Sequence, residues 1–268
     1  MDSVAFKRKR FGESLKSMLK VDIRRMRLSR TFYIIIALSL LIPIVMTVMM
    51  AMMDGTESID HMTGEVTVMQ GPENAWQNIG TLPGGENMGA TEIFAMCNIN
   101  MAFMGVAVFV CIFVSDDFRS GFAKNIFTTR GGKAEYVISK TLVGFITGSL
   151  MLLSYFIGSM LSGAIAGLSF DLHGLGALNI LFCLLSKSAL MLVFVPIFTA
   201  ISVAAKERTW LSILASLGGG MLLFMTVSLV TPLNSGVMNL VLTLAGGALF
   251  SIGLGAISNL ILNKTRLV

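Results

Sequence analysis

Long stretches without a charged residue are the feature that most constrains this chain. They are residues 31–53, 93–115, 141–170, 172–205, which is interrupted only by Lys187, and 209–263. Each is at least as long as the roughly 20 apolar residues with which a helix crosses a bilayer. The stretches are continuously apolar, whereas the strands of an outer-membrane barrel alternate apolar and polar residues. The chain is therefore expected to be an all-α polytopic membrane protein.

The last stretch is long enough for two helices, because Thr231-Pro232-Leu233-Asn234-Ser235-Gly236 supplies turn residues near its middle. Six transmembrane helices are expected, at residues 31–53, 93–115, 141–165, 177–203, 209–230 and 237–262. The first is not a cleaved signal peptide, since it is too long and about 30 residues precede it. Residues 1–268 form one transmembrane domain, in which the outer loop 54–92 has room for a hairpin or a short helix.

The distribution of basic residues predicts the orientation. Of the 20 Lys and Arg residues, all except Lys187 fall in residues 1–30, in the loop between spans two and three, between spans four and five, or after span six. The opposite loops contain acidic residues and no Lys or Arg. By the positive-inside rule the basic side is the cytoplasm, so we expect a cell-membrane protein with both termini cytoplasmic. The net charge of +5 then reflects topology and not a nucleic-acid partner.

The segment before the first span has an apolar stripe. Phe11, Leu15, Leu19, Ile23 and Met26 recur at spacings of four, four, four and three, with basic residues elsewhere around the helix. This pattern predicts, within residues 1–30, an amphipathic helix that lies on the inner leaflet. A solvated basic tail that only sets topology is the alternative.

Motifs for catalysis or cofactor binding are absent from the sequence. Its cysteines, Cys97, Cys111 and Cys183, fall inside spans, and its two histidines are isolated. Gly132-Lys133 is followed by Ala134, where a phosphate-binding loop needs Ser or Thr. We therefore expect no enzyme activity, no metal and no cofactor in this chain. The methionines near the end of the first span could suit a soft metal, but Met as packing filler is the more common use.

The loop after span two carries the most specific motif. It reads Asp117-Phe118-Arg119-Ser120-Gly121-Phe122, continues through Phe127 to a basic turn at Arg130, and reaches the third span at Lys140. Together with the overall layout, this loop resembles that of the permease subunits of type-2 ABC exporters. In that family an acidic residue precedes a small pair, here Asp117 and Ser120-Gly121. Asp replaces the more usual Glu, and Phe122 replaces the usual Thr.

The resemblance implies a half-transporter without an ATP site of its own. Two permeases, either copies or paralogues, would pair in the lipid bilayer on separate ABC ATPase subunits, which bind ATP and Mg²⁺. The loop would form a cytoplasmic coupling helix that docks the ATPase through Asp117, Phe118, Ser120, Gly121, Phe122, Phe127 and Arg130. Its aromatic residues suit anchoring in a partner's cleft. A loop that only sets topology is the alternative.

Lys187 is the one charged residue inside a span, and such residues are costly and often functional. No acidic residue lies within a span to pair with it. Asn98, Asn100, Asn259 or water in a central cavity could accept its hydrogen bonds. The alternative is that the side chain snorkels to the outer headgroups.

The expected function is therefore the permease subunit of an ATP-driven exporter. An amphipathic or antimicrobial peptide, or a lipid-like compound, is the favoured substrate. An ion-coupled secondary carrier or a membrane scaffold without transport stays open as the alternative. Small residues such as Gly158 and Ser162 are expected to serve helix packing within the chain.

Overall fold

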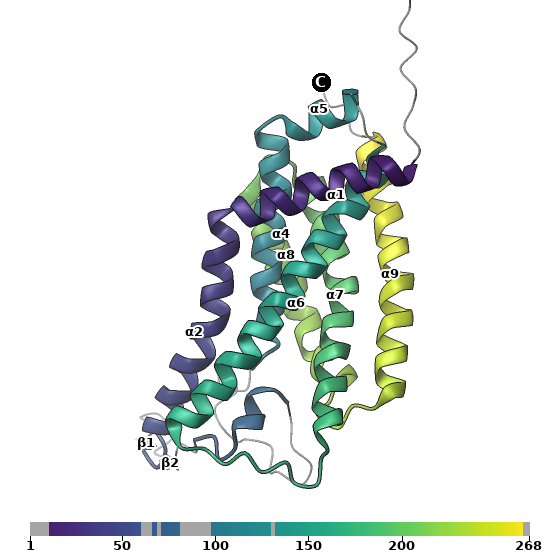
Figure 1. The fold of residues 1–268 in the computed structure, drawn as a ribbon. Helices are drawn as coiled ribbons and strands as arrows, with labels where there is room; N and C mark the ends of the chain where they lie inside the picture. Colours follow the sequence, from purple (N-terminus) through teal and green to yellow (C-terminus); the bar gives the residue numbers. More distant parts are fainter. Residues whose placement is uncertain (1–10, 60–65, 69–70, 81–97, 130–131, 265–268) are drawn as a thin grey trace, which may run out of the picture.

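The computed structural model describes residues 11–59, 66–68, 71–80, 98–129 and 132–264, most of them helical (Figure 1). The helices are α1 (Phe11–Leu28), α2 (Arg30–Met52), α4 (Met101–Arg119), α5 (Phe122–Thr129), α6 (Lys133–Ala166), α7 (Ala177–Ala205), α8 (Thr209–Val230) and α9 (Val237–Lys264). The strands β1 (Glu57–Ile59) and β2 (Val66–Val68) form an antiparallel hairpin, and η1 (Ala75–Asn78) is a short 3₁₀ helix.

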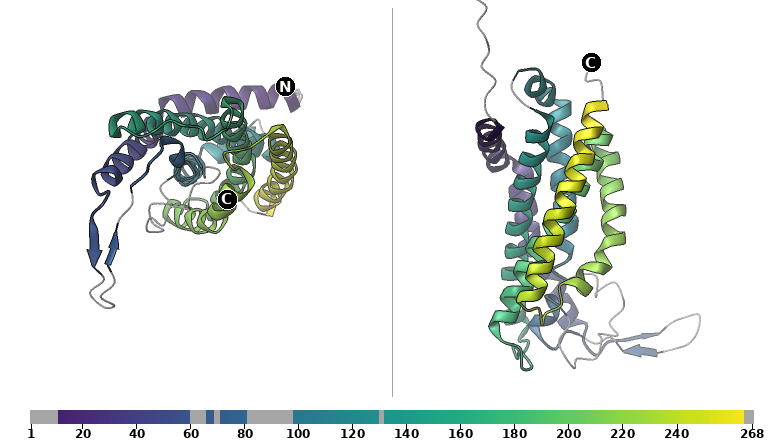
Figure 2. Two further views of the ribbon diagram at one scale, coloured as in Figure 1. Left: turned by 90° about the horizontal axis from the view of Figure 1, so that it is seen from below. Right: turned by 90° about the vertical axis from the view of Figure 1, so that its right-hand side faces the viewer.

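The helices form an elongated bundle with two distinct ends (Figures 1 and 2). At one end, here called the α5 end, lie α1, α5, the start of α6 and the end of α9. At the other, the hairpin end, lie β1, β2 and η1. Within the described residues, α2, α4, α6, α7 and α9 are long and apolar enough to cross a membrane. The helix α8 is also apolar, and its assignment as a further span is considered below.

Large apolar side chains cover the outside of the bundle. On α8, Leu222 and Leu229 are each 82% exposed, and on α9, Leu249 and Ile252 are each 72% exposed. Apolar surface on this scale is not tolerated on a soluble monomer, but it matches the hydrocarbon of a bilayer. The protein is a multi-pass membrane protein.

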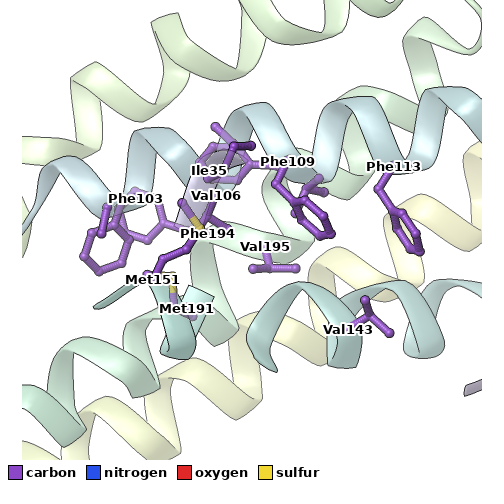
Figure 3. Packing of buried hydrophobic residues seen from close by; sticks show 14 of the residues in the cluster. Ile35, Phe103, Val106, Phe109, Phe113, Val143, Met151, Met191, Phe194 and Val195 are labelled. Atoms are coloured by element: carbon purple, nitrogen blue, oxygen red, sulfur yellow. The ribbon is translucent and has the colours of Figure 1, made fainter. Parts of the chain in front are cut away.

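The core lies where α4 meets α6 and α7 (Figure 3). The rings of Phe103 and Phe194 lie 4.6 Å apart between α4 and α7. Glycine brings α6 close to α7, because a Cβ on Gly144 would lie 2.4 Å from Val195. The expected use of small residues also holds at Gly158, whose Cα packs against α2, since a Cβ there would lie 2.3 Å from the carbonyl oxygen of Leu40.

The segment before η1 and η1 itself close the hairpin end of the bundle. The backbone N–H of Ala75 donates to the carbonyl of Ser169 at 2.9 Å, and the Trp76 indole N–H donates to that of Phe170 at 3.1 Å. Asn78 donates to the Thr47 hydroxyl of α2 at 2.8 Å. The outer loop was expected to have room for a hairpin or a short helix, and its described part contains one of each.

Four of the expected spans agree with helices to within two residues at each end, namely α2, α7, α8 and α9. The other two expectations need correction. Helix α4 continues past residue 115 to Arg119, and α6 begins at Lys133, well before residue 141. Charged residues were taken as the limits of these spans, but Asp117 and Lys140 are buried against each other inside the helices. Residues 93–97 of the expected second span lie outside the described residues.

Candidate functional site

The region around α5 brings four helices together at one end of the bundle. Helix α4 ends in a tight turn, in which Gly121 adopts φ +73° and the Ser120 hydroxyl donates to the Asp116 carbonyl at 2.6 Å. Glycine suits this left-handed conformation because it lacks a Cβ. Helix α5 then crosses the end of the bundle to α6, while α1 lies against the first part of α6, at an oblique angle to it (Figures 1 and 2).

Asp117 is the centre of a buried ion cluster beneath α5. Its Oδ2 accepts a hydrogen bond from the Tyr136 hydroxyl at 2.9 Å and lies 2.6 Å from Lys140 Nζ. Its Oδ1 accepts a hydrogen bond from the guanidinium of Arg25, which comes from α1. One carboxylate on α4 is therefore bonded to both α6 and α1.

Asp22 of α1 is the second carboxylate of the cluster. Its Oδ1 lies 2.7 Å from Lys140 Nζ, and its Oδ2 accepts from the Ser139 hydroxyl at 2.6 Å. Asp22, Asp117 and Lys140 are all buried, and Arg25 is partly buried. Two carboxylates and two cations leave the cluster neutral. A buried charge is tolerated when it is paired, and each charge of this cluster has a partner of opposite sign.

Aromatic rings enclose the two cations. The ring of Phe122 on α5 lies 4.2 Å from the guanidinium carbon of Arg25, and the ring of Phe113 lies 4.3 Å from Lys140 Nζ. Both distances are within the range of a cation–π attraction. Further along α5, Phe127 meets the ring of Tyr136 edge-on at 5.2 Å. The aromatic side of α5 is thus held against the bundle.

These contacts change how the predicted docking residues are understood. Asp117 and Phe118 belong to α4 and are buried within the chain, so a direct contact with a partner is not open to them. Phe122 and Phe127 are half-buried against Arg25 and Tyr136, and anchoring in a partner's cleft would require them to leave these rings. Ser120 is exposed and Gly121 half-exposed at the turn, while Arg130 lies outside the described residues.

The outer surface of α5 is polar. Lys124, Asn125 and Thr128 are exposed, and the Thr128 hydroxyl donates to the carbonyl of Lys124 at 3.0 Å. A partner that meets α5 from outside would contact these side chains together with Ser120. Docking of a partner at this surface stays a prediction.

Lys187 lies at a second polar site, nearer the hairpin end. Its Nζ donates to Asn100 Oδ1 at 2.8 Å and to the Thr231 hydroxyl at 3.2 Å. Asn100 in turn donates to the Ser228 hydroxyl at 2.8 Å. The side chain joins α7 to the residue that precedes α4 and to the residue that follows α8.

Of the two readings of Lys187, the one with a polar acceptor inside the bundle is confirmed, since Asn100 is such an acceptor. The residue is only 1% exposed, so within this chain it neither lines a hydrated cavity nor reaches the headgroups. Of the three expected partners, Asn100 binds it directly. Asn98 accepts from the Asn100 backbone N–H at 2.9 Å, and Asn259 lies near the far end of α9. Thr231 was missed because it was assigned to a turn, whereas its hydroxyl faces the bundle interior.

Sequence reasoning also missed the contribution of α1 to the buried ion cluster. Asp22 is spaced by four from Met18 and from Met26, and all three lie on the buried face of α1 with Ser14. An acidic residue at regular spacing within the buried stripe was the available signal. It went unused because the apolar stripe from Phe11 to Met26 was taken as the side of the helix that lies on the inner leaflet.

No family model, curated protein or solved structure matched this chain. Among the described residues, no group of three or more His, Cys, Asp or Glu side chains could hold a metal ion.

Proposed function

We propose that this chain is the transmembrane permease subunit of an ABC exporter of the type-2 class. Two such subunits, identical or paralogous, form the substrate pathway in the cell membrane. Each rests on a separate ATPase subunit, which binds ATP and Mg²⁺. In this proposal α8, with 22 residues, is the sixth span.

The observation that carries the proposal is the way in which α5 packs against the end of the bundle. A helix of eight residues between two spans lies across the end of the bundle, with a polar outer surface and an inner surface fixed by Phe122 and Phe127. Through the ion cluster it is connected to α4, α6 and α1. A force applied to α5 by a partner would reach three helices at once, as a joint requires.

The orientation follows from the charges at the two ends. In the part of the chain described here, every Lys and Arg except Lys187 lies at the α5 end. Acidic residues at the hairpin end include Asp54, Glu57 and Asp171. By the positive-inside rule the α5 end is cytoplasmic, and the first and last described residues, Phe11 and Lys264, lie at that end, so α5 faces the compartment that contains ATP.

Energy for transport must come from a partner in this proposal. The Gly132-Lys133 pair, which could suggest a phosphate loop, has a structural use instead. Gly132 precedes α6, and Lys133 Nζ donates to the Leu262 carbonyl of α9 at 2.8 Å. The acidic hairpin end favours a cationic, amphipathic substrate such as an antimicrobial peptide, and a lipid-like compound is the other favoured class.

Site-specific crosslinking tests the proposal. A photoreactive benzoylphenylalanine in place of exposed Lys124 on α5 should crosslink, in native membranes, to a protein that mass spectrometry identifies as carrying a nucleotide-binding loop. The same group in place of Lys264, exposed at the end of α9, is the matched control. Crosslinks from position 124 only to proteins without such a loop, or no crosslink there, would contradict an ATPase joint at α5.

A further inference from the structure

Helix α1 has two opposite faces. Ser14, Met18, Asp22 and Met26 are buried against the bundle. On the other side Lys16, Lys20, Arg24 and Arg27 are exposed. Their spacings of four, four and three place these four basic residues along one side of a helix that turns 100° per residue. We call this stripe the basic face of α1.

The basic face has no acidic partner among the described residues. None of its four side chains makes an ion pair with any described residue, although Glu13 lies on the same side of the helix. In contrast, Arg25 of the same helix faces inward and is paired with Asp117. The charge of the basic face is therefore available to something outside the chain.

The position of α1 indicates what that partner is. The helix lies beside α6 at the α5 end and runs across the long direction of the bundle, and α2 follows it directly (Figures 1 and 2). When the exposed apolar surfaces of the spans lie in hydrocarbon, α1 lies at the level of the headgroups. A row of cations at that level is complementary to lipid phosphates, above all to those of anionic lipids on the cytoplasmic leaflet.

The inward side of α1 connects this face to α5. Asp22 is bonded to Lys140, and Arg25 is bonded to Asp117 and covered by Phe122 of α5. We propose that the basic face of α1 binds anionic phospholipid headgroups and that the buried ion cluster transmits this contact to α5. Membrane charge then regulates the joint, an inference that rests on the proposed function and the orientation it assigns.

Lipid binding is tested on the purified full chain without an ATPase. Fluorescent phosphatidylglycerol is titrated into the protein in detergent, with phosphatidylcholine for comparison. Changing Lys16, Lys20, Arg24 and Arg27 together to Gln should weaken phosphatidylglycerol binding by at least about fivefold, the contribution of a single basic residue at an anionic surface. The matched control changes the exposed residues Lys124, Lys206, Arg208 and Lys264 to Gln.

The control should keep the wild-type affinity for phosphatidylglycerol. Equal affinity of the wild type for the two lipids would overturn the proposal, since the basic face would then be only solvated. Equal weakening in the control variant would also overturn it, because any cytoplasmic charge would then serve. Neither result bears on the ATPase crosslink, so the two proposals can fail separately.

The link to α5 is tested by amide hydrogen exchange in phosphatidylcholine bilayers with and without phosphatidylglycerol. The anionic lipid should slow exchange in both α1 and α5 of the wild type. Phe122→Leu removes the ring over Arg25 and should abolish the response in α5 while α1 still responds. If α5 of the wild type does not respond, or if Phe122→Leu responds like the wild type, the cluster does not transmit the contact.

Discussion

At the scale of single residues, neutrality governs the ion cluster. Asp117 and Lys140 are both fully buried, and each is surrounded by groups of opposite charge. Removing one charge leaves the others without full compensation in a region of low polarity. Breaking a buried pair in this way usually costs about 3–5 kcal/mol, whereas removing both partners costs much less.

A double-mutant cycle tests this coupling. Asp117→Asn leaves the cluster with an excess positive charge, and Lys140→Met leaves it with an excess negative charge. Each should lower the free energy of unfolding by about 3–5 kcal/mol. The double variant is neutral again, because Asp22 and Arg25 remain, 3.8 Å apart. Its loss in free energy of unfolding should therefore be smaller than the sum of the losses in the two single variants. Reversible unfolding in mixed micelles measures all three variants, and additive losses would contradict the coupling.

The hydrogen bond between Lys187 and Asn100 gives a second prediction, which compares the effect on stability of replacing each partner. Lys187→Met removes an ammonium that has no acidic partner among the described residues, so stability should change little. Asn100→Leu instead leaves the ammonium buried without its nearest acceptor and should cost about 2 kcal/mol or more. Unfolding of the two variants under the same conditions compares them. A greater loss in Lys187→Met would show that the ammonium is needed for folding.

At the scale of elements, the crossing of α2 and α6 depends on one glycine. A Cβ at Gly158 would lie 2.3 Å from the Leu40 carbonyl oxygen and 2.8 Å from Pro43 Cγ. A contact with backbone cannot be relieved by a rotamer change, so the helices must separate. Gly246 on α9 offers the comparison, since nothing lies within 4 Å of a Cβ built there.

Gly158→Ala should therefore lower the thermal stability of the protein in detergent, by about 1–3 kcal/mol as for other overpacked sites. Gly246→Ala should leave stability unchanged or raise it slightly, because Ala favours a helix over Gly. Light scattering during heating follows both variants. Equal midpoints for Gly158→Ala and the wild type would mean that the two helices do not cross as closely as described.

Most of the helices could be predicted from sequence, because uncharged apolar length and turn residues at Thr231–Gly236 reflect local requirements of a bilayer and a backbone. The limits of α4 and α6 could not be predicted in this way. There Asp117 and Lys140 remain inside helices because partners distant in sequence, Asp22 and Arg25, neutralise them. Such pairing depends on tertiary structure, so a charge count taken along the chain cannot detect it.

The candidate site was predicted only in part, again because its contacts depend on residues that are distant in sequence. The motif Asp117 to Phe122 lies where α4 ends and α5 begins, and the helix expected in this loop is present as α5. The direction of its aromatic rings was not predictable, because an aromatic residue can anchor a helix to its own chain as well as to a partner. Only the positions of Arg25 and Tyr136 decide between these uses.

At the scale of the whole molecule, topology is the first test. Cysteine in place of Asp171, exposed between α6 and α7, should react with an impermeant thiol reagent in intact cells expressing an otherwise Cys-free protein. Cysteine in place of exposed Ser120 should react only after the membrane is opened. The reverse pattern of labelling would show that the orientation in the membrane is the opposite one, with α5 on the side that lacks ATP.

The central claim is that a separate ATPase acts on this membrane subunit through α5. The most direct measurement is ATP hydrolysis by the ATPase that crosslinks at position 124, in vesicles that contain it alone, with the wild-type chain, or with the Phe122→Leu variant. We predict that the wild-type chain changes the rate of hydrolysis, that Phe122→Leu reduces this change, and that the chain alone hydrolyses no ATP. A rate that is the same with and without the wild-type chain would contradict the account.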